Sequence, residues 1–379
     1  MEFKALKDIA KITMGQSPDS SSYNEEKEGL PFFQGNADFG ELYPNERVWC
    51  NEPKKVAEPG DILISVRAPI GALNYAKDKC CIGRGLAAIT IEDEAERNYV
   101  FHLLKARNND LNQRGIGSTF KAIGKNVLEE VAVPQISRDE QQKCMDMMDL
   151  LESIIRERKS QLDKLDELIK ARFVELFGDT VINPKGWTEH RLDEYITFLT
   201  SGSRGWAQYF TDEKNELFIT IKNVKNNHIT LDDIQYVDAP ENKEAERTKV
   251  KTGDLLISIT ADLGRTGVVD DSIADRGAYI NQHLSLVRLD QDKINPLYVS
   301  YFLETSGGKR QFERKNQNGV KAGLNFEAIK SLKILVPPIE MQEQYLDFVK
   351  QVDKSKVAVQ KALDEAQLLF DSLMQDYFG

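Results

Sequence analysis

Residues that could carry catalysis are few in this chain and stand far apart. Its 379 residues include four histidines, His102, His190, His228 and His283. None has a Ser, Cys or Asp neighbour in the pattern of a catalytic triad. Gly307-Gly-Lys309 lacks the earlier glycine of a nucleotide-binding loop, and the Asn-Pro pairs at Asn183 and Asn295 lack the second proline typical of amino-methyltransferases. We therefore predict a chain that is not an enzyme and holds no cofactor of its own.

Metal sites are not indicated either. The four cysteines are Cys50, Cys80, Cys81 and Cys144. They form no CxxC pair and no Cys/His spacing that could hold zinc, and we expect Cys80 and Cys81 to be small buried residues in a reducing cytosol. Pro18-Asp19 with Glu25-Glu26-Lys27 offers two carboxylates and a lysine, as in metal-dependent nucleases. The spacing is too short for an intervening strand, so we predict a serine-rich loop there.

The charge distribution limits what the surface can bind. A net charge of −11 argues against a chain that attracts nucleic acid over its whole surface. The sign reverses locally, because Arg97–Lys125 has six basic residues against one acidic and Ser306–Lys321 has five against one. Any anion-binding site is therefore local. The 41% of apolar residues, without a bilayer-length run or a signal peptide, predicts a soluble cytoplasmic protein.

The chain repeats itself once, which organises everything else. The matching segments, in order, are Leu30–Asn36 with Leu217–Asn223, Gly60–Val66 with Gly253–Ile259, Val133-Pro134 with Val336-Pro337, and Phe177-Gly178 with Phe378-Gly379. Each copy is a compact α+β body followed by one long helical segment. The predicted domains are a first body at 1–136, a first long helix at 137–179, a second body at 180–338 and a second long helix at 339–379.

Alternating and continuous apolar runs place strands and short helices inside the bodies. The expected strands are Asp61–Val66, Leu86–Ile91, Phe218–Ile221, Leu255–Ile259 and Leu284–Leu289. Short helices are expected at Asn98–Lys105 and Pro296–Leu303. The copies agree best in these elements and differ most in the polar loops between them. This is the pattern of one scaffold that carries two different binding surfaces.

The two long segments have apolar residues in heptad spacing, as in a coiled coil. The predicted seam residues are Met148, Leu151, Ile155, Leu162, Leu165, Ile169, Val349, Val352, Val359, Leu363, Phe370 and Leu373. Ser137-Arg-Asp-Glu140 is a capping box that starts the first helix, and Gly178 suits its end. About 40 residues make a rod of roughly 60 Å. We expect an antiparallel pair with an approximate twofold axis between the bodies; the alternative is that each stripe packs on its own body.

This arrangement resembles the specificity subunit of type I restriction–modification enzymes over essentially the whole chain. The motifs that carry the resemblance are Met14–Pro18, Gly29–Gly35, Gly60–Pro69 and Gly83–Ala88 in the first body, and Gly202–Trp206, Leu256–Gly264 and Ala278–His283 in the second. Each looks like part of a target recognition domain. A single motif would be weak support, but the ordered set before two equivalent heptad helices is specific.

The resemblance implies a DNA-binding function without catalysis. Each body would recognise one half of a bipartite, interrupted site in double-stranded DNA, and the antiparallel helices would set the gap between the halves. Two modification subunits, which use S-adenosylmethionine to methylate adenine, would dock on this chain. Restriction subunits, which use ATP and magnesium, would join them.

Residues for DNA contact follow from side-chain type and loop position. Arginine pairs with guanine at two points, Asn and Gln do so with adenine, and lysine mainly meets phosphate. The candidates in the first body are Gln16, Ser17, Gln34, Asn36, Arg67, Arg84 and Lys121. Those in the second are Arg204, Lys222, Asn223, Lys225, Arg265, Gln282 and Lys321. The competing interpretations are that Asn36 and Asn223 stabilise turns and that Arg84 pairs with Asp78. Trp206 and Tyr209 could insert near a displaced base, and the competing interpretation is that they are half-buried aromatic anchors.

Two rival hypotheses remain open at the sequence level. The chain could be a coiled-coil adaptor whose bodies bind peptides, or a self-sufficient restriction enzyme. The missing catalytic motifs weigh against the enzyme. The basic groups in loops weigh against the adaptor.

Overall fold

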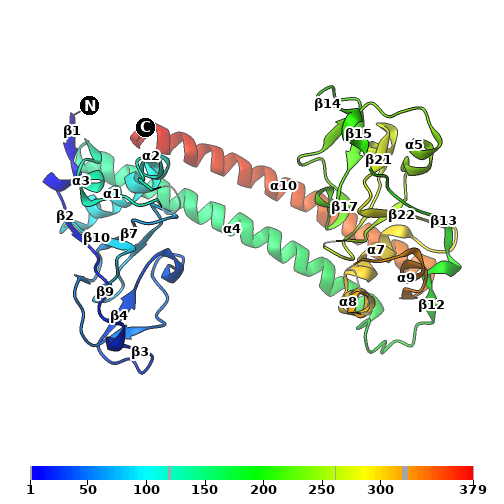
Figure 1. The fold of residues 1–379 in the computed structure, drawn as a ribbon, viewed down its shortest axis with the longest axis horizontal. Coiled ribbons are helices and arrows are strands. Elements are labelled where there is room, and N and C mark those ends of the chain that lie inside the picture. The colour runs from blue at the N-terminus through cyan, green and yellow to red at the C-terminus, as the bar shows by residue number, and fades with distance from the viewer. Residues whose placement is uncertain (1, 118–120, 261, 318–322, 379) are drawn as a thin grey trace. The chain divides into compact units, whose positions relative to one another are not determined.

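The computed structural model describes residues 2–117, 121–260, 262–317 and 323–378 (Figure 1). The chain forms two compact units, Met1–Gln161 with Val359–Gly379 and Leu162–Ala358. Each unit contains one α+β body and one part of each long helix, α4 (Arg138–Phe177) and α10 (Ile339–Phe378). None of the helices in the described part of the chain has the length and apolar character that a bilayer span requires.

The first unit is built on a two-stranded, a four-stranded and a five-stranded sheet. Their strand orders are β1-β11, β2-β10-β7-β8 and β3-β5-β4-β9-β6. The strands are β1 (Glu2–Ala5), β2 (Lys11–Met14), β3 (Tyr23–Asn24), β4 (Leu30–Phe33), β5 (Trp49–Cys50), β6 (Val56–Ala57), β7 (Ile62–Ser65), β8 (Leu73–Tyr75), β9 (Cys80–Ile82), β10 (Leu86–Thr90) and β11 (Ala132–Gln135). The short helices are α1 (Glu94–Ala106), α2 (Asn108–Gln113) and α3 (Lys125–Glu129).

The second unit repeats this plan with a two-stranded, a six-stranded and a four-stranded sheet. Their strand orders are β12-β23, β13-β22-β19-β20-β17-β16 and β14-β18-β15-β21. The strands are β12 (Glu189–Arg191), β13 (Ile196–Ser201), β14 (Phe210–Thr211), β15 (Glu216–Ile219), β16 (Val224–Lys225), β17 (Asn227–Ile229), β18 (Gln235–Val237), β19 (Leu255–Ser258), β20 (Thr266–Val268), β21 (Ala278–Ile280), β22 (Leu284–Leu289) and β23 (Lys333–Leu335). The helices are α5 (Lys243–Thr248), α6 (Asp271–Asp275), α7 (Pro296–Glu304), α8 (Ser306–Gln317) and α9 (Phe326–Lys330).

The internal repeat extends to individual backbone hydrogen bonds. β2-β10-β7-β8 in the first unit corresponds to β13-β22-β19-β20 in the second. Equivalent bonds are Gly60 N to Ala76 O and Gly253 N to Val269 O, Val66 N to Gly85 O and Ile259 N to His283 O, and Leu6 N to Val131 O and Leu192 N to Leu332 O. The same scaffold has therefore been built twice, as the repeated sequence predicts.

One detail of the predicted repeat is wrong by one residue. The match of Leu30–Asn36 with Leu217–Asn223 places Phe33 opposite Thr220. In the structure, however, Phe33 of β4 pairs with Ile82 of β9, and Ile219 of β15 pairs with Ile280 of β21. Ile82 and Ile280 are equivalent positions of the repeat. Phe33 therefore corresponds to Ile219. The sequences here share only alternating apolar character, which leaves a shift of one residue undetected.

The long helices begin and end at local signals that the sequence contains. Ser137 and Glu140 form the predicted capping box, with Ser137 N donating to the Glu140 carboxylate (3.0 Å) and Glu140 N donating to Ser137 Oγ (3.3 Å). The Ser137 hydroxyl, which donates to the Glu140 carboxylate at 2.7 Å, and the Ser137 N–H together hold the pKa of that carboxyl below its usual value. Gly178 ends α4 with a φ of +82°, a conformation that costs glycine little.

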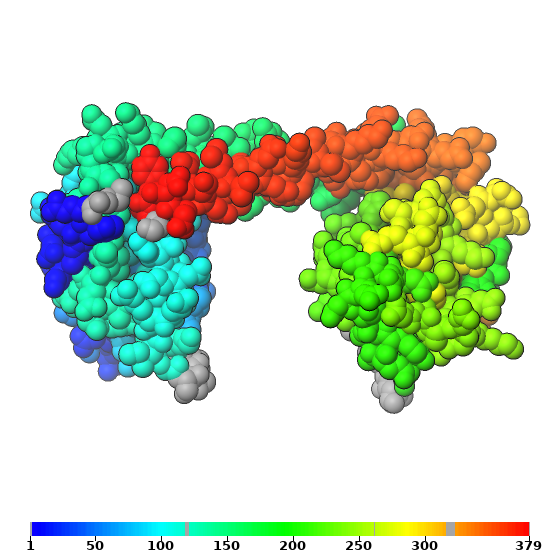
Figure 2. All heavy atoms as spheres, turned by 90° about the horizontal axis from the view of Figure 1, so that it is seen from above, coloured from blue at the N-terminus to red at the C-terminus, as the bar shows by residue number. Residues whose placement is uncertain are grey.

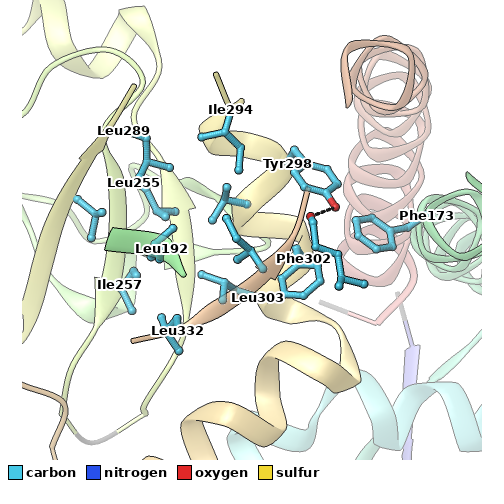
Figure 3. Packing of buried hydrophobic residues seen from close by; sticks show 14 of the residues in the cluster. Phe173, Leu192, Leu255, Ile257, Leu289, Ile294, Tyr298, Phe302, Leu303 and Leu332 are labelled. Atoms are coloured by element: carbon cyan, nitrogen blue, oxygen red, sulfur yellow. Dashed lines mark hydrogen bonds between the residues drawn. The ribbon is translucent and has the colours of Figure 1, made fainter. Parts of the chain in front are cut away.

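In the second unit, aromatic side chains attach both long helices to the body. Phe177, at the end of α4, packs on Tyr298 of α7 and Tyr345 of α10, with ring centroids 5.0 and 5.6 Å apart. Phe173, one turn earlier, stacks on Tyr298 at 5.9 Å, as Figure 3 shows. The Tyr298 hydroxyl, drawn there with its bond, donates to Leu335 O at 2.8 Å. Burying this cluster removes a large apolar area from water, and the contacts between the rings stabilise it further.

The first unit contains the corresponding attachment. Tyr99 of α1 is fully buried and its ring lies 5.1 Å from that of Phe378, the last residue of α10. Phe378 is equivalent to Phe177, because both end a 40-residue helix. Figure 2 shows these last turns of α10, in red, lying against the first body. The body thus holds the start of α4 and the end of α10.

The long helices run antiparallel, as predicted. In the second unit, Phe173 meets Tyr345 near the start of α10 while Asp166, earlier in α4, pairs with Lys356, later in α10. Eight seam residues are almost fully buried, and three of them, Ile169, Val349 and Val352, belong to the core of the second body. The other five are Met148, Leu151, Ile155, Leu363 and Phe370. Leu162, Leu165, Val359 and Leu373 are half-buried. The stripes therefore pack both on each other and on the bodies, so each of the two expected packing arrangements is partly realised.

Phe173→Ala tests this packing. We expect the free energy of unfolding to fall by roughly 3–5 kcal/mol, because the substitution leaves a cavity between α4, α7 and α10. Val174→Ala, at a neighbouring position that is 54% exposed, is the matched control and should change it by about 0.5 kcal/mol or less. Urea unfolding followed by circular dichroism measures both. Equal effects of the two substitutions would contradict the packing described.

Candidate nucleic-acid interface

Five loop segments of the first body meet through their backbones. Gln16 N donates to Ile82 O (3.0 Å), and Gly85 N, next to Arg84, donates to Gln34 O (3.0 Å). Arg84 N also donates to Ser17 Oγ at 3.3 Å. The segments that follow β2, β4 and β9 are thereby fixed beside one another. Side chains far apart in the sequence become neighbours at one end of the sheets.

The remaining two segments join them through the end of β7. Val66 N donates to Gly85 O (2.9 Å), and Ala68 N donates to Lys121 O (3.1 Å). Arg67, between these two donors, lies opposite Ala122 in an isolated bridge. All seven positions of the first body that are predicted to contact DNA, Lys121 included, are therefore carried by one connected set of loops.

The second body brings its loops together by the same bonds. Gly202 N donates to Leu284 O (3.0 Å), and Asn281 N donates to Ile219 O (3.0 Å). Ile259 N donates to His283 O, and Leu324 N donates to Ile259 O, both at 2.9 Å. Gln282 directly follows Asn281, Arg204 lies two residues after Gly202, and Lys222 lies three residues after the end of β15. The two bodies thus present different side chains on equivalent backbone.

Two equivalent glycines permit the close approach of the loops. A Cβ on Gly15 would lie 2.1 Å from Gly83 O, and a Cβ on Gly202 would lie 2.0 Å from Asn281 O. Both distances are far below a real carbon–oxygen contact. Only glycine fits at either position without displacing the neighbouring loop.

A buried serine shapes the loop that contains Arg67 and its counterpart in the second body. Ser65 Oγ donates to Pro69 O (2.6 Å) and accepts from Ala72 N (2.9 Å). Ser258 Oγ likewise donates to Asp262 O and accepts from Arg265 N (2.9 Å). The hydroxyl closes each loop on itself, so the residues at its tip point away from the core.

Buried acidic residues fix the preceding turns. Asp61 and Asp254 accept bonds from Glu58 N (2.9 Å) and Lys251 N (2.7 Å), respectively. Burial raises the pKa of the Asp61 carboxyl. Asp254 is fully buried, and its carboxylate receives two bonds from Arg288, at 2.7 and 2.6 Å. These carboxylates belong to the scaffold and are not available to a ligand.

Most of the predicted DNA-contacting side chains are accessible. The exposed ones are Gln16, Gln34, Arg67, Arg84, Lys121, Arg204, Lys222 and Lys225, and the half-buried ones are Ser17, Asn36, Arg265 and Gln282. Arg265 pairs with Asp262, and Lys225 with Asp232 at 3.4 Å. The other basic side chains of this set form no ion pair with a described carboxylate, so their charge is available to phosphate or bases. Lys321 lies outside the described residues.

Asn223 is the clear exception. Its side chain is 1% exposed. Its amide oxygen accepts from Thr220 N (3.0 Å) and its amide nitrogen donates to Thr230 O and Asp232 O. Its counterpart is Asp38, which accepts from Gln34 N at 2.7 Å. Asn223 therefore stabilises a turn and cannot reach a base, so its predicted role in DNA contact is wrong.

The structure also decides the roles of Arg84 and Trp206. Arg84 forms no ion pair with Asp78 among the described contacts, so that pairing is wrong. Trp206 is 4% exposed, stacks on Phe218 at 5.3 Å and packs with a tilted ring against Tyr279 at 4.9 Å. It is an aromatic anchor of the second body.

Arg247 is a positioning residue that the sequence did not indicate. Its guanidinium donates to Thr200 Oγ1, to Ser201 O (2.8 Å) and to Ser203 Oγ (3.4 Å). It thereby holds the segment that leads to Arg204. Arg247 lies in a charged helix, α5, where nothing in the sequence separates it from surface arginines.

The cysteine side chains lie in the protein interior. The four cysteines are free and buried, as expected of Cys80 and Cys81. Burial raises the pKa of Cys80 to about 12 and that of Cys81 to about 11, so both thiols stay protonated. Within the described residues, no group of three or more His, Cys, Asp or Glu side chains is arranged to hold a metal ion.

The class of protein follows from a family model that covers both bodies. The model, described as the type I restriction modification DNA specificity domain, matches residues 1–165 and 184–366. The chain belongs to this family, and the predicted resemblance to type I specificity subunits is confirmed. The adaptor hypothesis gains no support.

Individual relatives agree with this assignment. The MjaX specificity subunit of a type I restriction enzyme from Methanocaldococcus jannaschii is 47% identical over 163 residues, which is 42% of this chain and 38% of that protein. The EcoBI specificity subunit from Escherichia coli is 19% identical over 404 residues, or 98% of this chain and 83% of that protein.

Solved structures show the same fold. The S subunit of a type I restriction–modification system from M. genitalium has a TM-score of 0.62 at 14% identity, over 100% of this chain and 96% of that one. A chain from a study of complex assembly and conformational transition of the type I system has a TM-score of 0.63 at 19% identity, over 100% and 97%.

Gly15→Ala tests the convergence of the loops. The added methyl group would collide with Gly83 O, so we expect a loss of roughly 1–3 kcal/mol in the free energy of unfolding. Gly35→Ala is the matched control, because a Cβ there meets nothing within 4 Å. Thermal unfolding compares the two. A Gly15 variant as stable as the Gly35 variant would show that the loops do not meet as described.

Proposed function

We propose that each body recognises one half of a bipartite, interrupted site in double-stranded DNA. The observation that carries this proposal is the pair of equivalent loop clusters, held by backbone bonds and tipped by different polar and basic side chains. Ser17 and Arg84 in the first body correspond to Arg204 and Gln282 in the second. A duplicated scaffold whose loops carry different side chains at their tips suits a DNA site with two different halves.

The proposed DNA contacts follow the accessible side chains. In the first body they are Gln16, Ser17, Gln34, Asn36, Arg67, Arg84 and Lys121. In the second they are Arg204, Lys222, Lys225, Arg265 and Gln282. Asn223 is removed from the set because it is buried. Lys321 stays a proposal from the sequence alone.

We further propose that the chain is not catalytic and directs partner subunits to the DNA sequence that it recognises. Two modification subunits would bring S-adenosylmethionine and methylate adenine, and restriction subunits would bring ATP and magnesium. Adenine must leave the base stack for methylation, and the partner's pocket would receive it. Family membership supports this division of labour, as does the excess of acidic residues in the long helices, which suits protein partners better than phosphate. The complex would act in the cytoplasm, where its DNA lies.

Shortening both long helices tests the bipartite model. Footprinting of the full chain with its modification subunits should show two protected stretches separated by a fixed gap. Removing seven residues from each helix, within 151–165 and 352–366, keeps the heptad seam and removes about 10 Å. The gap should then shorten by roughly three base pairs. Continuous protection, or an unchanged gap in the shortened variant, would refute the model.

Arg67→Ala tests the assignment of base contacts. Loss of a two-point contact to guanine should relax one base position in one half-site by roughly 1–3 kcal/mol. Arg138→Ala removes the same charge from the start of α4, where Arg138 pairs with Asp93, and should leave the sequence preference unchanged. Binding to a panel of single-substitution duplexes measures both. Uniform weakening of all duplexes by Arg67→Ala would make Arg67 a phosphate contact instead.

A further inference from the structure

Ile116 is an apolar residue in the described part of the first loop cluster that has no role in the core. Ile116, which follows α2, is 82% exposed. A single exposed apolar side chain is common and needs no explanation by itself. Its position among the candidate DNA contacts is what distinguishes it.

The backbone places Ile116 on the same face as Arg67. Ile116 and Ala122 exchange two hydrogen bonds, both of 3.0 Å, and lie directly opposite each other. Ala122 also lies opposite Arg67 on its other side. Directly opposed residues of antiparallel segments project to one face. Ile116 and Arg67 therefore flank Ala122 on a common face.

The spacing of these segments limits which bases the two side chains can contact together. Neighbouring strands lie about 4.8 Å apart, so two steps separate Ile116 from Arg67 by about 10 Å. Base pairs rise by about 3.4 Å each. A base contacted by Ile116 would thus stand roughly three base pairs, or fewer, from a base contacted by Arg67.

The chemistry of DNA selects one partner for such a side chain. The C5-methyl group of thymine is the one alkyl group on the edges of the four bases, and only the major groove presents it. Arginine makes its two-point contact with guanine in the same groove. An apolar and a guanidinium group on one face therefore suit a thymine and a guanine in one stretch of major groove.

We propose that Ile116 contacts the C5-methyl group of a thymine in the half-site recognised by the first body, within about three base pairs of the base contacted by Arg67. This inference rests on the proposed function. It adds a residue that determines specificity by shape and apolar contact. A different role, that of an apolar wedge between stacked bases, is an outcome of the test.

Selection from randomised duplexes comes first. The full chain with its modification subunits should yield a bipartite consensus, and Arg67→Ala should identify the half-site of the first body. Failure to obtain any consensus would refute the proposed function and the role of Ile116 with it, whereas the deoxyuridine experiment below can refute the role of Ile116 alone. The two failures are therefore distinguishable.

Replacing thymine by deoxyuridine then removes only the methyl group. At one thymine of that half-site, the substitution should weaken binding of the unaltered chain by about fourfold, the ratio expected for burying one methyl group. The same substitution should have no effect on the Ile116→Ala variant, which should also accept other bases at that position. Ile116→Val keeps a branched apolar side chain and should retain the preference for thymine.

A matched control uses another exposed isoleucine. Ile182, 76% exposed in the segment after α4, should tolerate Ile182→Ala without any change in sequence preference. Unchanged circular dichroism spectra would show that both alanine variants are folded. The inference is overturned if deoxyuridine has no effect at any thymine of the half-site, as a wedge would predict. It is equally overturned if Ile116→Ala weakens all sequences alike.

Discussion

The structure depends on one repeated contact, in which a buried tyrosine of each body packs against the last residue of a long helix. Tyr99 meets Phe378 and Tyr298 meets Phe177. Each phenylalanine ends the helix that begins at the other body. Because every body therefore holds the beginning of one helix and the end of the other, neither helix can detach without exposing aromatic surface. The seam between the helices alone would bury less, since Leu162, Leu165, Val359 and Leu373 are only half-buried.

A second constraint acts at the loops. There the scaffold relies on backbone hydrogen bonds, a buried serine hydroxyl and glycines that tolerate close approach, and the exposed side chains contribute little to it. Ser65 and Ser258 perform the same function in loops whose tips differ. The stability of the frame and the chemistry of its surface are thus carried by different atoms. This separation explains how one fold can hold two unlike binding surfaces.

The architecture could largely be predicted from the sequence, because repetition, heptad spacing and the capping box at Ser137 report directly on it. The register of β4 against β15 could not, since alternating apolar residues match equally well after a shift of one. The location of the candidate site could be predicted from the loops that carry polar and basic residues. Which of those residues are accessible could be predicted less well, because residue type does not reveal burial. Asn223 has a side chain of a type that can contact DNA, yet its amide forms hydrogen bonds within a turn instead. Arg247 and Ile116 show the opposite case, since their roles come from tertiary neighbours that no spacing in the sequence records.

The two glycines at positions 15 and 202 carry a consequence for how the chain can change over time. Since a methyl group at either position would collide with the facing loop, these sites tolerate almost no replacement. The solvent-facing tips one or two residues away touch little of the interior and can vary freely. Rigid and permissive positions thus alternate along the same short segment. Single substitutions at the tips can therefore change the exposed surface while the frame that depends on the glycines is kept.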